Sequence, residues 1–81
     1  MGTHEQDRKA LRAIKGIVIV ARKMAYDGND HRKIAELLDH CEYLPEILLT
    51  EQESFKAFDR YLEEIVNDFP MCQWVIDEYR S

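Results

Sequence analysis

The chain has 81 residues, enough for one domain with a modest core, and its 46% of apolar residues excludes a disordered chain. The net charge of −5 is unevenly placed: residues 1–33 carry eight Lys or Arg and four Asp or Glu, whereas residues 34–81 carry three and twelve. The longest apolar run, Ile17–Ala21, is too short for a membrane span or a secretion signal, so we expect a cytoplasmic protein.

Residues 5–26 have the apolar spacing of an amphipathic helix. The line expected to face the core consists of Leu11, Ile14, Val18, Ala21 and Ala25, flanked by Ile17, Val20 and Met24. A helical wheel places the basic residues on the opposite half, namely Arg8, Arg12, Lys15, Arg22 and Lys23. The β-branched run Gly16–Val20 would suit a buried strand, but no other segment could pair with it. We therefore predict a helix, and because its apolar half is wider than one neighbour covers, it suggests a homodimer.

The segment Tyr26–Asp30 is expected to end this helix and to start the next one. Gly28 suits a left-handed C-terminal cap, and Asn29 or Asp30 can accept the free amide hydrogens of the following helix. These roles explain the cluster without a ligand.

A second helix is predicted over residues 30–43. Its inward stripe consists of Ile34, Leu37, Leu38, Cys41 and Leu44. Pro45 is expected to end it, because proline disfavours helical angles at the preceding residue. Residues 46–49 then form a short helical turn, and Thr50 with Glu53 has the pattern of a capping box that starts a third helix over residues 51–68.

The third helix has the clearest division between apolar and charged positions. We expect its inward side to comprise Phe55, Phe58, Leu62, Ile65, Val66 and Phe69. Asp68 is predicted to cap a last helix that begins at Pro70, with Cys72, Val75, Ile76 and Tyr79 turned inward. Trp74 either closes the edge of the core or forms a surface anchor. The predicted fold is all-α, a compact bundle of four helices plus a short helical turn in a single domain over residues 1–81, with residues 1–4 flexible.

The chain offers no pattern for catalysis. Cys41 and Cys72 both fall on apolar stripes, which predicts buried free thiols and no disulfide. The three histidines His4, His31 and His40 lack the spacing of a zinc site, and the three glycines form no phosphate loop. We therefore expect no enzyme, no metal and no cofactor.

Two kinds of binding remain as hypotheses. In the first, an acidic surface with Glu53, Asp59, Glu63 and Glu64 docks a basic protein in a regulatory, adaptor or immunity-like (antitoxin-like) role. In the second, the basic face of the first helix contacts the phosphates of a nucleic acid, against which the overall negative charge weighs. Alternatively, the basic helix lies beside the acidic ones and neither face is used, because exposed ion pairs contribute little.

The segments Tyr26–Asp30, Ile34–Asp39 and Glu42–Pro45 consist of cap, core and turn residues. Through these segments, the stretch from Ala21 to Leu49 resembles the short helical proteins of unassigned role that are found in bacterial genomes and mobile gene cassettes. The resemblance implies a bacterial source and a helical fold, and it carries no activity and no site residues. The size, acidity and helix count are similar to those of colicin-type immunity proteins by class only.

Overall fold

A computed structural model describes the backbone of residues 2–81 and the side chains from residue 5 onward. In this range, the helices are α1 (Gly2–Tyr26), α2 (His31–Thr50), α3 (Ser54–Asp68) and α4 (Gln73–Arg80), with a one-turn 3₁₀ helix η1 (Pro70–Cys72) before α4. The predicted all-α bundle is confirmed, although its short helical turn lies at η1. Met1 lies outside the described residues, and the flexibility predicted for residues 1–4 stays a prediction.

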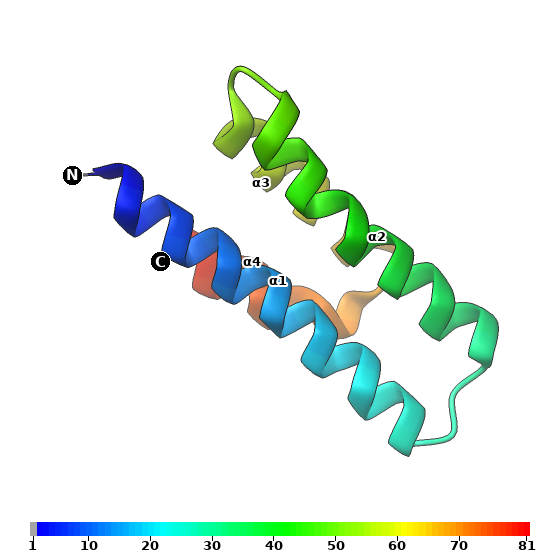
Figure 1. The fold of residues 1–81 in the computed structure, drawn as a ribbon. Coiled ribbons are helices and arrows are strands. Elements are labelled where there is room, and N and C mark those ends of the chain that lie inside the picture. Colours follow the sequence, from blue (N-terminus) through cyan, green and yellow to red (C-terminus); the bar gives the residue numbers. More distant parts are fainter. Residues whose placement is uncertain (1) are drawn as a thin grey trace.

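The four helices lie in two layers. α1 and α2 form an antiparallel pair, with α3 packed behind α2 and α4 packed behind α1 (Figure 1). The molecule measures 42 × 23 × 18 Å, and its long dimension follows α1, whose 25 residues span about 37 Å. The short α4 covers only part of α1, which leaves surface of α1 exposed at both ends.

The core lies between the two layers and takes its largest side chains from α3. Phe58, Leu62 and Ile65 are buried there, as predicted, and Phe69 closes the end of the helix. Cys72 and Cys41 are buried free thiols, which confirms the expectation for both cysteines.

The core side of α1 differs from the predicted one. Leu11 and Val18 were expected to face inward, but their side chains are 62% and 43% exposed. Ala25 is exposed as well. Ile17, Val20, Ala21 and Met24 are buried as predicted, and Ala10 and Ala13 are buried with them. α4 comes close to α1 at Gly16, where an added Cβ atom would lie 3.1 Å from Cγ2 of Val75. The buried side of α1 thus combines small residues at the contact with α4 and large ones such as Ile17 and Met24.

The turn between α1 and α2 follows the prediction. Gly28 has a φ of +78°, in the left-handed region that favours glycine. The Asn29 backbone N–H donates to the Met24 carbonyl at 3.0 Å, as in a Schellman motif. The Asp30 carboxylate accepts a hydrogen bond from the Arg32 backbone N–H at 2.9 Å and caps α2.

The predicted end of the second helix at Pro45 is wrong, because α2 continues through Pro45 to Thr50. A proline inside a helix costs about 3 kcal/mol, since it removes one backbone hydrogen bond. The continuation buries Ile47, which is 5% exposed, and half-buries Leu48. Burial of an aliphatic side chain contributes about 1.5–3 kcal/mol, so the two together offset the cost of the proline.

Both side-chain caps predicted for the later helices are also wrong. The Thr50 hydroxyl donates to the Glu46 carbonyl at 2.7 Å within α2, so it does not cap α3. α3 starts one turn later, after Glu53, without a side-chain cap. Asp68 is the last residue of α3, and Phe69 occupies the N-cap position of η1.

Candidate protein interface

The described residues contain no group of three His, Cys, Asp or Glu side chains that could hold a metal ion. In the same part of the chain, none of the helices combines the length and the apolar character needed to cross a bilayer. The two thiols are poor nucleophiles, because burial raises the pKa of Cys72 to about 11 and also raises the pKa of Cys41. The charged side chains predicted to bind a partner lie on the surface.

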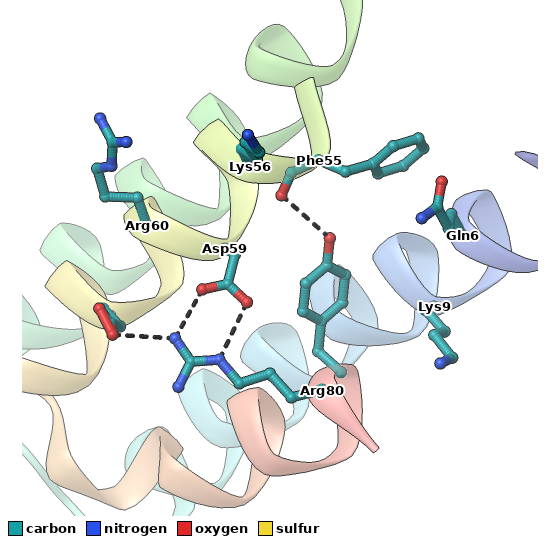
Figure 2. Close-up of a pocket in the computed structure, with 9 residues that line it drawn as sticks. Gln6, Lys9, Phe55, Lys56, Asp59, Arg60 and Arg80 are labelled. Atoms are coloured by element: carbon teal, nitrogen blue, oxygen red, sulfur yellow. Dashed lines mark hydrogen bonds and ion pairs between the residues drawn. The ribbon is translucent and has the colours of Figure 1, made fainter. Parts of the chain in front are cut away.

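The predicted acidic residues of α3 are partly neutralised by a neighbour on α4. Arg80 donates from Nε and Nη2 to the two carboxylate oxygens of Asp59, at 3.0 and 2.6 Å. Its Nη2 also donates to Glu63 Oε1 at 3.0 Å. Figure 2 shows Arg80 reaching from α4 across to Asp59 on α3. The hydrogen bonds from Arg80 lower the pKa of Asp59.

A polar cleft of about 570 Å³ surrounds this ion-pair cluster, between the start of α1, α3 and the end of α4 (Figure 2). Lys9, Lys56 and Arg60 line it together with Asp59 and Glu63. Arg80 lines it as well, so four basic residues face two acidic ones, and both carboxylates already accept hydrogen bonds from Arg80. Its contacts join α3 to α4 and are structural.

Of the four predicted acidic residues, only Glu64 is without an ion pair among the described residues. Glu53 pairs with Lys56 at 3.7 Å, and Asp59 and Glu63 pair with Arg80. The four residues thus do not form one free acidic surface. Glu64 does not line the cleft; it is exposed and lies one turn after Tyr61 on α3.

A cluster of aromatic rings lies beside Glu64, where α2 meets α3. The Nδ1 atom of His40 lies 2.7 Å from the Tyr61 hydroxyl, and the rings of Tyr43 and Tyr61 are 5.1 Å apart between centroids. Tyr43 is 51% exposed, so one face of its ring remains free. Burial raises the pKa of Tyr61, and the charge of Glu64 raises it further.

Acidic side chains border these rings. Asp39 lies one helical turn before Tyr43 on α2, Glu36 lies one turn further back, and Glu64 lies one turn after Tyr61 on α3. All three are exposed, and within the described residues none has an ion pair. We call Glu36, Asp39, Tyr43, Tyr61 and Glu64 the tyrosine patch.

Sequence reasoning missed this patch, because it depends on the register of α2 against α3. The available signal was the spacing of His40 and Tyr43 on α2, three residues apart, with Tyr61 at the border between the charged and apolar sides of α3. Three aromatic or imidazole rings at such border positions indicate a contact between neighbouring helices.

The basic residues predicted on the first helix all lie exposed on α1: Arg8, Arg12, Lys15, Arg22 and Lys23. None of the ion pairs found among the described residues involves α1. The described part of the chain therefore does not neutralise the basic face of α1 by pairing it with the acidic helices.

Trp74 closes the edge of the core, which is the first of the two alternatives considered for it, and its role as a surface anchor stays a prediction. Its Cη2 atom lies 3.3 Å from the position of a Cβ atom at Gly16, so the indole closes the gap between α4 and α1. It is also 44% exposed and lines an apolar pocket of about 380 Å³ with Ile19 and Met71.

Comparison with family models, with curated proteins and with solved structures gives no match for this chain. The resemblance to small bacterial helical proteins therefore stays a prediction, and the proposals below depend on the geometry of this molecule alone.

Proposed function

We propose that this protein acts inside the cell by binding another, basic protein, in a regulatory, adaptor or immunity-like role without catalysis of its own. The observation that supports this best is the tyrosine patch, in which the half-exposed ring of Tyr43 is held against Tyr61 among unpaired acidic side chains. Tyrosine is enriched among the residues that dominate binding energy at protein interfaces.

The patch is also pre-organised. The contact between His40 and the Tyr61 hydroxyl restrains one ring, and that ring restrains Tyr43. A side chain that is already ordered loses less entropy on binding. The acidic border adds a long-range attraction that raises the rate of encounter with a basic partner and weakens with salt.

The cluster around Arg80 supports this function less well. A basic partner that docked on Asp59 or Glu63 would first have to displace Arg80 from its three hydrogen bonds. The tyrosine patch presents its carboxylates without such competition, which is why we place the interface there.

The test is affinity capture from the cells that produce the protein, at low ionic strength, with four immobilised proteins compared side by side. These are the wild type, Tyr43→Ala, Glu64→Lys and the control Glu51→Lys, which makes the same charge change at an exposed position outside the patch. We expect one basic protein to bind the wild type and the control, and to be lost or reduced at least about tenfold with the two patch variants. Equal capture by all four proteins would contradict the proposal, and so would the absence of any basic protein.

The alternative partner, a nucleic acid on the basic face of α1, is tested in a second experiment. Fluorescently labelled duplex and single-stranded oligonucleotides are titrated with the wild type and with Arg12→Glu at low salt. Binding that weakens in Arg12→Glu and falls steeply with salt would favour the nucleic acid over the basic protein.

A further inference from the structure

The outer side of the α1–α2 pair exposes two apolar rows. On α1 the row consists of Leu11 and Val18, seven residues apart and 62% and 43% exposed. On α2 it consists of Leu38, Pro45 and Leu49. Leu38 was predicted to face inward but is 44% exposed, and Leu49 is 81% exposed. Large side chains at heptad spacing, left open to water, are typical of a helix face that packs against another helix.

The two rows lie on the same face of the molecule. The Cys41 thiol lies 3.6 Å from the Ile14 carbonyl, which marks the line along which α1 and α2 touch. Leu11 and Val18 lie one turn on either side of Ile14, and Leu38 and Pro45 lie one turn on either side of Cys41. Because both rows are exposed while α3 and α4 cover the other side, they form one outer face, which we call the hairpin face (Figure 1).

The charges that border the hairpin face differ in sign between the two helices. On α1, a basic row runs beside the apolar row. It consists of Arg8, Lys15 and Arg22, which are also seven residues apart and lie one turn away from Leu11 or Val18. On α2, Glu42 and Glu46 lie one turn away from Leu38, Pro45 and Leu49. The face therefore has an apolar centre, a basic edge and an acidic edge.

We infer that the hairpin face binds a second copy of this chain, with α1 of each copy lying on α2 of the other. A twofold axis parallel to the helices exchanges the two edges, so that the basic edge of each copy meets the acidic edge of the other. In the other arrangement, α1 of one copy would lie on α1 of the other. The three basic side chains of one edge would then face the same three of the second copy, and their repulsion excludes this arrangement.

This arrangement also predicts which charges meet. A twofold axis parallel to the helices keeps each residue at its own height along the bundle. Ile14 and Cys41 are in contact and therefore lie at the same height. Lys15 comes directly after Ile14, and Glu42 comes directly after Cys41, so these two charged residues also lie near that height. Lys15 of one copy therefore pairs with Glu42 of the other, and the contact occurs twice in the dimer.

The size of the hairpin face is sufficient for a specific contact. Over the 20 residues of α2 the pair is about 30 Å long, and two helices side by side are about 20 Å wide. The flat area is roughly 600 Å² per copy, at the lower limit of specific interfaces, which bury about 1,200 Å² in total. We therefore expect a dimer that dissociates in the micromolar range.

The test is sedimentation equilibrium over a series of protein concentrations that extends to about 100 times a micromolar dissociation constant. We expect the wild type to form a dimer, and Leu38→Glu to raise the dissociation constant at least about tenfold. The control is Met71→Glu, the same kind of change at a 50%-exposed apolar residue on η1, away from the hairpin face. Circular dichroism confirms that each variant is folded. A wild type that stays monomeric throughout overturns the inference, as does a dimer that Met71→Glu weakens and Leu38→Glu does not.

The pairing of charges is tested by exchange. Lys15→Glu and Glu42→Lys should each weaken the dimer, because each places like charges opposite one another. The double variant, in which the two charges are exchanged, should restore the affinity to within about threefold of the wild type. A double variant as weak as the single ones overturns the pairing of α1 with α2.

Discussion

Arg80 and Asp59 are joined by two hydrogen bonds, from Nε to Oδ2 and from Nη2 to Oδ1, although 20 residues separate them in the chain. This bidentate contact connects the last turn of α4 to the first half of α3. A helix of eight residues is not stable alone in water, so α4 depends on contacts of this kind and on its buried side.

The pH dependence of stability should report this contact. Arg80 lowers the pKa of Asp59 in the folded protein. The carboxylate therefore stabilises the fold above the unfolded pKa of about 4, and this contribution is lost as the pH falls through the folded pKa. Urea unfolding at pH 7 should find Asp59→Asn less stable than the wild type by about 0.5 kcal/mol, a small value because solvent screens the pair. At pH below about 3 the difference should shrink towards zero, and a difference that is unchanged or larger in acid would contradict this assignment.

The core prediction concerns Leu62, which is 1% exposed in the middle of α3. Leu62→Ala should lower the free energy of unfolding by about 2–5 kcal/mol, because it removes buried apolar surface and leaves a cavity. Asn67→Ala, at an exposed position of the same helix, is the control and should change it by less than about 0.5 kcal/mol. Chemical denaturation followed by circular dichroism measures both, and similar values for the two variants would show that α3 is packed differently.

Gly28 allows a test of the backbone alone. A Cβ atom added there would meet no atom within 4 Å, so Gly28→Ala causes no clash and its cost comes from the φ of +78°. We expect a loss of about 1 kcal/mol, with Gly28→Asn losing less because asparagine tolerates this conformation better. Thermal unfolding of the three proteins should rank them in the order glycine, asparagine, alanine, and any other order would argue against the left-handed turn.

The buried thiols predict slow chemical modification. With a pKa of about 11, Cys72 is ionised in about one molecule in a thousand at pH 8, and its side chain has no exposed surface. A disulfide reagent should therefore react with two thiols at once in denaturant but slowly in the native protein, with Cys72 slower than Cys41. Fast reaction of both cysteines without denaturant would be incompatible with the packing of α4.

The sequence was sufficient to predict those parts of the fold that local chemistry determines. The φ of Gly28 and the cap at Asp30 follow from the preferences of single residues, and the buried side of α3 follows from a regular spacing of large apolar residues. The buried side of α1 was predicted only in part: residues such as Ile17 and Met24 are buried as expected, but Leu11 is exposed. A helical wheel weights Leu11 above Ala10 and does not show that α4 comes close to α1 at Gly16.

The candidate interfaces were predictable only in part. The exposure of charged residues on α1 and α3 follows from amphipathicity, whereas their pairing depends on which helices are neighbours. Asp59 was expected to be free and is held by Arg80, and Tyr43 gains its position from Tyr61. Each of these contacts joins separate helices, and the period of one helix carries no information about the register of another.

Pro45 gives α2 a weak point that its continuous appearance hides. A proline has no amide hydrogen, so the carbonyl of Cys41 receives no bond from the position that would normally supply it. The final turn of α2 is therefore joined to the rest by an incomplete ladder, and its amide protons should exchange with solvent deuterium sooner than those near Leu37. We therefore expect the part of α2 that follows Pro45 to open while the part before it stays closed.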